Sequence, residues 1–220
     1  MPSASTWSTS ASSTFEYEAP SLLLGVTLTE LVVVGLCDLD SGRNQTIKID
    51  LGDATLSESY VREDDLVFTG EDTLESPVRT QVYIRGLPEE SACELILSRQ
   101  TSLLDHAAPI ALQLSGQQIF RLAAGHLVAA QSNLEPPEEL ALALYVDEET
   151  ACCVFFFPGD ADEIEVEQTH LTIRTCTQSL EKGVIRRVRV RLFFCPISEL
   201  ETTLAVRYAD FRRSELPLTT

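Results

Sequence analysis

The sequence predicts an all-β protein: an antiparallel β-sandwich or barrel-like domain, or domains, with at most one or two short helices. Three observations support this prediction. Short apolar segments are separated by turn residues along most of the chain. Within several of these segments the apolar residues recur at every second position. Of the 220 residues 44% are hydrophobic and 23% are charged, so the chain is able to bury a large core.

The clearest hairpin is predicted near the N-terminus. Residues 31–39, LVVVGLCDL, are apolar and rich in β-branched side chains. The following DSGRN supplies turn residues, and QTIKIDL then places Ile47, Ile49 and Leu51 on one face of a strand. We therefore expect two antiparallel strands joined by a tight turn.

Similar patterns recur further along the chain. Strands are expected in DLVFTG and VRTQVYIRG, and hairpins in PIALQLSGQQIFRL, with SGQQ as the turn, and in CCVFFFPGDADEIEVE, where Pro158 and Gly159 open the reversal. A helix is the alternative for PEESACELILSRQTSLL, which starts at Pro88 and has early glutamates. PPEELALAL from Pro136 fits a short helix or a strand.

Composition suggests how the chain is divided. Residues 1–14 are rich in Ser, Thr and Ala and predict a flexible polar tail. No basic residue precedes Arg43, so the segment fits neither a secretory signal nor a transit peptide. We expect the β-sandwich region to cover residues 15–213, and a subdivision near 133–139, in NLEPPEE, stays open. Residues 214–220 are expected to form a short tail.

The cysteines indicate a reducing compartment. None of the six stands in a C-x-x-C motif, and each lies in an apolar run where a free thiol packs as a small hydrophobic group. No run of 18 apolar residues is present, so no membrane span is expected. We therefore expect a soluble cytoplasmic protein that needs neither a metal nor a cofactor.

Positive charge is concentrated near the C-terminus. Residues 1–170 hold 7 basic and 29 acidic side chains, net -22, while residues 171–220 hold 9 and 5, net +4, which gives the overall -18. In GVIRRVRVRLFF, strand alternation would put every second side chain on one face, about 6–7 Å apart, where the arginines repel one another. We therefore expect an acidic surface against them. The candidate interaction residues are Arg186, Arg187, Arg189 and Arg191 on one side and Glu163, Glu165 and Glu167 of EIEVE on the other.

The identity of that acidic surface stays open at this point. If residues 170–178 and 184–194 form a hairpin, HLTIRTC would lie opposite the arginines and the glutamates elsewhere. An acidic loop such as VREDD, or a second molecule, would then be the partner. Nucleic acid is disfavoured because the net charge of -18 opposes phosphate binding.

The sequence lacks the usual catalytic motifs. It has no G-x-S-x-G elbow, P-loop, G-x-G-x-x-G or H-E-x-x-H segment. We therefore expect a non-enzymatic protein–protein interaction or structural β-sandwich protein, and one form of this expectation is self-association through its acidic N-terminal part and the strand 186–191. One alternative is an acidic chaperone or sequestering protein for a basic partner. Another is a hydrolase or ligand-binding β-barrel whose site is assembled only by the fold.

Overall fold

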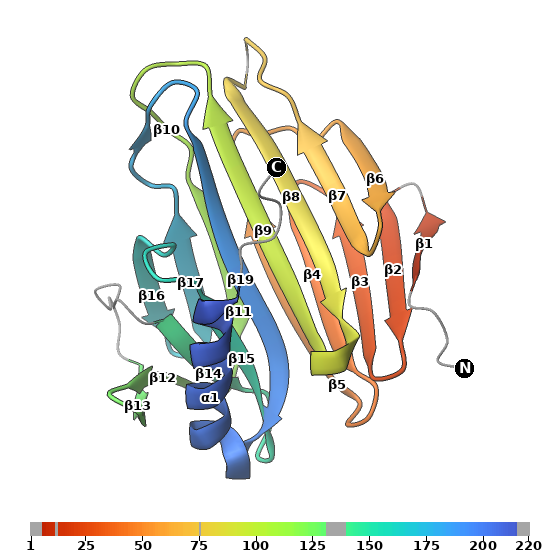
Figure 1. The fold of residues 1–220 in the computed structure, drawn as a ribbon, viewed down its shortest axis with the longest axis vertical. Coiled ribbons are helices and arrows are strands. Elements are labelled where there is room, and N and C mark those ends of the chain that lie inside the picture. Colours follow the sequence, from red (N-terminus) through yellow and green to blue (C-terminus); the bar gives the residue numbers. More distant parts are fainter. Residues whose placement is uncertain (1–5, 12, 75, 131–139, 215–220) are drawn as a thin grey trace.

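The fold consists of two antiparallel sheets and one α-helix (Figure 1). The computed structural model describes residues 6–11, 13–74, 76–130 and 140–214. The predicted all-β antiparallel sandwich is confirmed, with one helix outside the sheets. Within the described residues, no helix has the length and apolar character required to cross a membrane.

Sheet A has eight strands. In spatial order they are β1 (Thr6–Ala11), β2 (Thr14–Ala19), β3 (Leu22–Leu28), β4 (Val32–Asp38), β5 (Arg43–Asp50), β11 (Ile110–Ser115), β17 (His170–Thr175) and β16 (Glu163–Glu167). Residues 6–11 of the segment expected to be a tail thus pair with β2 as an edge strand. The division into tail, sandwich region and second tail stays a prediction, since 131–139 and 215–220 lie outside the described residues.

Sheet B has nine strands. Their spatial order is β13 (His126–Ala129), β12 (Ile119–Ala123), β14 (Leu140–Tyr145), β15 (Thr150–Phe156), β19 (Ile185–Pro196), β9 (Ala92–Thr101), β8 (Val78–Leu87), β7 (Asp65–Gly70) and β6 (Glu58–Arg62). A small two-stranded sheet joins β10 (His106–Ala107) to β18 (Ser179–Leu180). The 3-10 turns η1 (Pro88–Glu90) and η2 (Ile197–Glu199) precede β9 and the helix α1 (Leu200–Arg213).

The main core lies between the two sheets. Strand alternation turns one side chain in two inward, so Ile47 and Ile49 of β5 meet the layer that includes Val188 and Val190 of β19. All four side chains are fully buried. Burial of this kind contributes roughly 1.5–3 kcal/mol for each large aliphatic side chain, which makes the interior of the sandwich its main source of stability.

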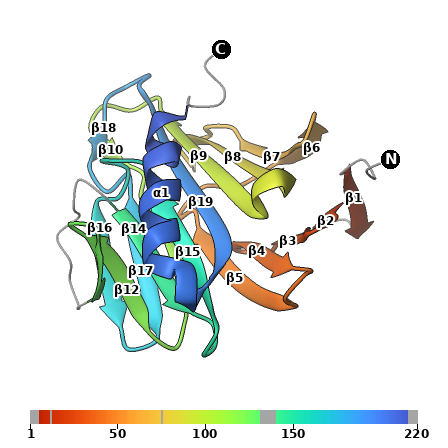
Figure 2. The ribbon, with the colours of Figure 1, turned by 60° about the horizontal axis from the view of Figure 1, so that its bottom comes forward.

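Helix α1 covers part of the outer face of sheet B (Figure 2). Its buried side chains Leu204, Tyr208 and Phe211 pack on the aromatic side chains of β15 and β19. The Tyr208 hydroxyl accepts a hydrogen bond from the Leu140 N–H (2.9 Å) and donates one to the Phe156 carbonyl (3.2 Å). The helix is therefore bonded to the main chain of the sheet as well as packed on it.

Several local predictions are confirmed and others are wrong. The hairpin β4–β5 forms as expected, with Val34 opposite Ile47. The segments on each side of SGQQ and PGDAD are strands, but neither pair forms a hairpin, because β11 and β16 belong to sheet A while β12 and β15 belong to sheet B. Turn residues reverse the chain in both cases, and here the reversal carries it from one sheet to the other.

The two helix alternatives are also resolved. The segment that begins at Pro88 forms only η1 and then continues as strand β9, whose ten residues pair with both β8 and β19. Of the segment that begins at Pro136, the described residues 140–144 are in strand β14, so the Leu–Ala alternation indicates a strand. All six cysteines are free, and five of them are buried as the sequence predicts, whereas Cys37 is only half-buried.

Candidate functional site

The arginines of β19 have their acidic partner within the chain. Arg189 and Arg191 point to the outer face of sheet B and are buried with Glu94 of β9. The Glu94 carboxylate accepts hydrogen bonds from Arg189 Nε (2.8 Å) and Arg191 Nη2 (2.8 Å), and it lies 2.7 Å from Arg189 Nη2. The expected acidic surface therefore exists, but Glu94 supplies it instead of EIEVE.

Glu94 and Arg191 belong to a row of charged side chains that crosses four strands. Strand register places Arg191, Glu94, Arg85 and Asp65 side by side on β19, β9, β8 and β7. Arg85 binds Asp65 through two hydrogen bonds, at 2.6 and 2.7 Å. Alternating charges in one row offset the repulsion that neighbouring arginines on one strand would otherwise produce.

The remaining two arginines lie at the start of β19. Arg186 donates a hydrogen bond to the carbonyl of Gly159 and has the Asp160 carboxylate 3.9 Å away. Burial raises the pKa of Asp160 to about 6, although the Arg189 N–H donates to its carboxylate. Burial raises the pKa of the Tyr83 hydroxyl on β8, and nearby Arg187 opposes this rise only in part.

The glutamates of EIEVE lie in the other sheet. Strand β16 is the edge of sheet A, and Glu163 and Glu165 face Arg174 of β17, at 3.5 and 3.2 Å. The expected facing of EIEVE and the arginine strand is therefore wrong, since β16 and β19 belong to different sheets. Whether the seven candidate residues contact a partner protein stays a prediction.

A hollow of about 470 Å³ lies on the outer face of sheet A, and we call it the polar groove. Four strands, β5, β11, β16 and β17, contribute to it. Most of its side chains are amides, hydroxyls or charged groups. The lining residues are Asn44, Gln45, Thr46, Lys48, Gln113, Leu114, Ser115, Glu167, His170, Leu171 and Thr172.

Strand alternation explains why polar side chains gather there. In β11, Leu112 and Leu114 point into the core, so Gln113 and Ser115 point outward. Register then aligns Gln113 with Lys48 of β5 and with Thr172 of β17. A second row places Ser115 opposite His170, and His170 opposite Glu167. The groove is thus a regular product of the sheet and not of a loop.

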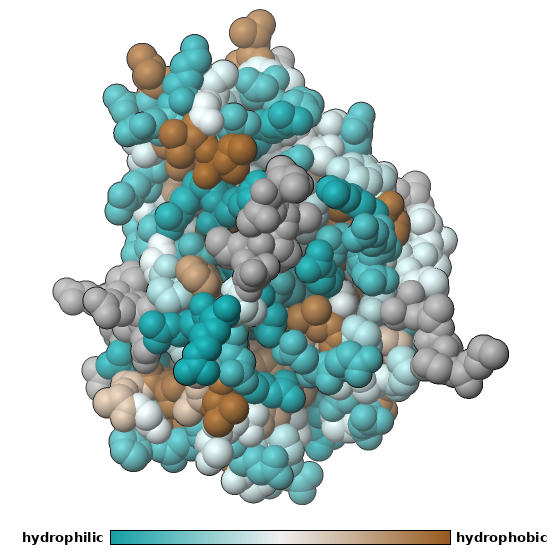
Figure 3. Space-filling view, viewed as in Figure 1, coloured by the Kyte–Doolittle hydropathy of each residue, from teal (hydrophilic) through white to brown (hydrophobic). Residues whose placement is uncertain are grey.

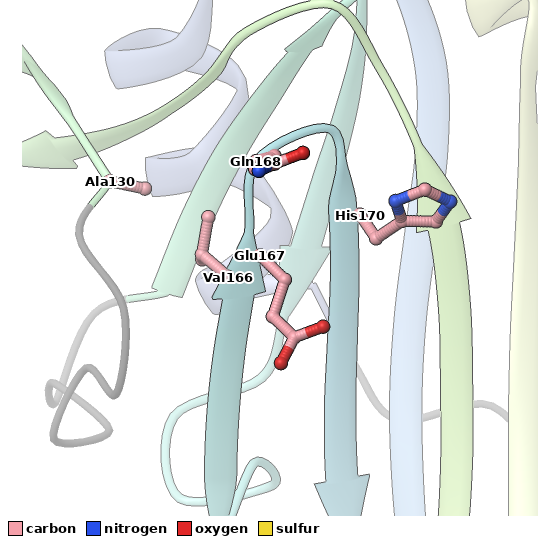
Figure 4. A pocket seen from close by; sticks show the side chains of 5 residues that line it. All are labelled: Ala130, Val166, Glu167, Gln168 and His170. Carbon is pink, nitrogen blue, oxygen red and sulfur yellow. The ribbon is translucent and has the colours of Figure 1, made fainter.

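Glu167 and His170 flank the turn between β16 and β17 (Figure 4). Gln168 in this turn has a positive φ of 51°. The two side chains are opposite each other in register, with Cβ atoms about 4.5–5.5 Å apart. They also line a second hollow of about 720 Å³, together with Ala130, Val166 and Gln168. A carboxylate and an imidazole therefore stand at one end of the polar groove.

Reasoning from the sequence alone missed the groove residues Lys48, Gln113, His170 and Thr172. In the sequence these residues appear only as the polar positions of segments that alternate polar and apolar residues, such as the Gln in IALQLS. Such positions are expected on any sheet that has one face in solvent, so they do not indicate a binding site. Only the register of non-consecutive strands brings these residues together. Among the described residues, no group of three His, Cys, Asp or Glu side chains is arranged to hold a metal ion.

Comparisons with known proteins identify similar folds only. No protein-family model and no curated protein matches the sequence, whereas 26 chains of solved structures match the fold. A GH36 alpha-galactosidase from Geobacillus stearothermophilus matches with a TM-score of 0.47 and 9% identity over 87% of this chain and 41% of its own. A galactose 1-epimerase from Lactobacillus acidophilus matches with a TM-score of 0.44 and 8% identity over 88% and 99%.

A putative aldose 1-epimerase from Escherichia coli is similar at a TM-score of 0.40, with 8% identity over 66% of this chain and 69% of that one. These structures are carbohydrate-processing enzymes. This finding corrects the expectation of a non-enzymatic interaction or structural protein: the three similar structures named above are enzymes, and none is a structural protein. At these TM-scores the similarity does not assign an activity or a substrate to this chain.

Proposed function

We propose that the protein binds a small carbohydrate in the polar groove of sheet A. The observation that carries this proposal is the convergence of neutral hydrogen-bonding side chains from neighbouring strands, above all Gln113, Ser115 and Thr172, in one hollow. Amide side chains offer donors and acceptors together, and hydroxyl side chains do both with one oxygen. A ligand that forms hydrogen bonds with all of these side chains needs several groups that both donate and accept. The hydroxyl groups of a sugar have this property.

The size of the groove supports a ligand of one or two sugar units. Its volume of about 470 Å³ lies within the usual range for small-molecule sites, roughly 300–1,000 Å³. The floor is main chain from three paired strands, β5, β11 and β17. Side chains mounted on such a floor are held in fixed positions, which lowers the cost of ordering them when a ligand binds.

The test is a binding titration with a matched pair of variants. Gln113→Ala removes an amide from the groove, while Gln178→Ala removes an exposed amide elsewhere on the surface. We expect isothermal titration with galactose, glucose and lactose to give binding that Gln113→Ala weakens by about 2- to 10-fold, the value of one hydrogen bond. Gln178→Ala should bind as wild type. Absence of binding to every sugar at millimolar concentration would reject the proposal.

Acid–base chemistry on the bound sugar is the second candidate function, and the facing of Glu167 and His170 favours it. Interconversion of the α and β anomers needs one group to take the proton of the anomeric hydroxyl and another to protonate the ring oxygen, so that the ring opens and closes again. A carboxylate and an imidazole can perform these two roles.

This candidate is tested separately from binding. We expect wild type to accelerate the change in optical rotation of freshly dissolved α-galactose, and Glu167→Gln or His170→Gln to reduce that acceleration about 100-fold or more. Glu163→Gln, at the same sheet edge but outside the groove, is the matched control. Wild type with no effect beyond that of buffer would exclude the catalytic role and leave carbohydrate binding standing.

We also propose that the protein works in a reducing compartment, as the sequence suggested. Support comes from the six free cysteines, none of which is joined in a disulfide. Mass spectrometry of protein alkylated in a denaturing lysis buffer, in which the five buried thiols also react, would test this. Six modified thiols are expected, and intramolecular disulfides would contradict it.

A further inference from the structure

We infer that the ligand of the polar groove carries a negative charge, as a uronic acid does. This inference rests on the proposed function, because it names the class of sugar that the same groove takes. The observation behind it is Lys48, a positive charge in the groove that has no carboxylate partner among the described residues. The chain has only one other lysine, Lys182.

Lys48 lies near the middle of sheet A. Strand β5 has four strands on one side and three on the other. Ile47 and Ile49 point into the core, so the Lys48 side chain stands on the outer face, where it is exposed and lines the groove. Its cross-strand neighbours are Val33 and Gln113, which are both uncharged. The strand pairing thus fixes the base of this side chain at the groove floor.

The acidic groups on the same face have other partners or lie at a distance. Glu167, which also lines the groove, is three strands from Lys48 and two residues further along, about 16 Å away. Asp50 is two residues along β5, about 6–7 Å away, and its Oδ1 accepts a hydrogen bond from the Gly52 N–H at 2.8 Å. Glu165 is three strands away in the row of Lys48, about 14 Å, and forms an ion pair with Arg174 at 3.2 Å. No ion pair of Lys48 occurs within the part of the chain that the structure describes.

An unpaired ammonium in this position favours an anion. It carries three hydrogen-bond donors, and charge-assisted bonds to a carboxylate are about twice as strong as neutral ones. A hollow also focuses the field of a charge placed in its wall. The net charge of -18 repels anions at long range, so the attraction to Lys48 has to act at short range inside the groove. The same side chains that bind sugar hydroxyls surround Lys48, which points to one ligand with both features.

The test compares galactose with galacturonate, which differ by a carboxylate at one carbon. Isothermal titration at about 50 mM salt is done with wild type, Lys48→Gln and the control Lys182→Gln. We expect wild type to bind galacturonate about 10-fold more tightly than galactose, a ratio that falls as salt rises. Lys48→Gln should bring the ratio close to 1, and Lys182→Gln should preserve it. Lys48 is exposed, so both variants should unfold at the wild-type urea concentration.

The outcomes separate the inference from the proposed function. Equal binding of the two sugars by wild type, or a preference that survives Lys48→Gln, would overturn the inference while leaving carbohydrate binding intact. Loss of the preference in Lys182→Gln as well would show a general charge effect and overturn it too. Failure of both sugars to bind at millimolar concentration would reject the proposed function and the inference with it.

Discussion

Replacing Glu94 by glutamine should strongly destabilise the protein. Glu94 is 2% exposed and Arg189 is 3% exposed, so the pair is buried on the outer face of sheet B beside α1. The variant keeps the size of the side chain but removes the charge that compensates two guanidinium groups. Arg189 would keep a neutral amide oxygen at position 94, the Phe211 ring, 4.6 Å away, and the Ser214 carbonyl at 3.4 Å, but it would lose the negative charge of Glu94.

The expected loss is about 3 kcal/mol, the lower end of the range for breaking a buried ion pair, roughly 3–5 kcal/mol. We place it at the lower end because the glutamine oxygen still accepts hydrogen bonds. Urea unfolding at pH 7, followed by circular dichroism, measures it. Glu90→Gln is the control, because the Glu90 side chain is 44% exposed and its ion pair with Arg191 is worth about 0–1 kcal/mol. Equal destabilisation by the two variants would refute the reasoning.

Three further predictions use the same unfolding assay. Burial raises the pKa of Asp160 to about 6, so the stability that its protonated form contributes is complete below pH 4 and is lost as the pH rises through 6. The free energy of unfolding of Asp160→Asn should therefore rise by up to roughly 3 kcal/mol relative to that of wild type between pH 4 and 7.5. A constant difference between the two proteins over this pH range would contradict the prediction. Gly86→Ala should cost roughly 1–3 kcal/mol, because a Cβ there meets the Tyr17 ring, whereas Gly25→Ala, with no atom in reach, should cost nothing. Tyr208→Phe should cost about 1–3 kcal/mol through two main-chain groups left unbonded; no loss would show that packing alone holds α1.

The strands could be predicted because each is a local pattern. Residues 31–51 alternate and enclose a turn sequence, and both strands of that hairpin form where expected. The crossovers after β11 and β15 could not be predicted, because SGQQ and PGDAD reverse the chain equally well within one sheet or between two. Whether a strand belongs to sheet A or sheet B depends on which strand, distant in the sequence, pairs with it. The residues of the turn contain no information about that pairing.

The partner of the arginine strand was hidden for the same reason. Glu94 and Arg189 are 95 residues apart, and only the pairing of β9 with β19 brings them together. Figure 3 shows mainly hydrophilic side chains on the face of the molecule seen in Figure 1, with a few hydrophobic patches. Alternation correctly placed Val188, Val190 and Leu192 of β19 in the core between the sheets. Helix α1 was missed although Leu200, Leu204, Tyr208 and Phe211 recur at helical spacing.

The polar groove could be predicted in part, for the same reasons. Each of its strands shows a polar half that the sequence reveals, but Lys48, Gln113 and Thr172 become neighbours only through the pairing of β5 with β11 and of β11 with β17. Three segments distant in the sequence are needed, and none carries a motif. A site of this kind is found from the register of the sheet and not from the spacing of residues.

The most direct test of carbohydrate binding is an NMR titration of isotope-labelled protein with galacturonate. We predict that the amide signals that move will belong to β5, β11 and β17 around Lys48, Gln113 and Thr172, and that they will saturate together at millimolar sugar. Shifts confined to the α1 face of sheet B, or no shifts at tens of millimolar, would contradict the assignment of the polar groove as a sugar site.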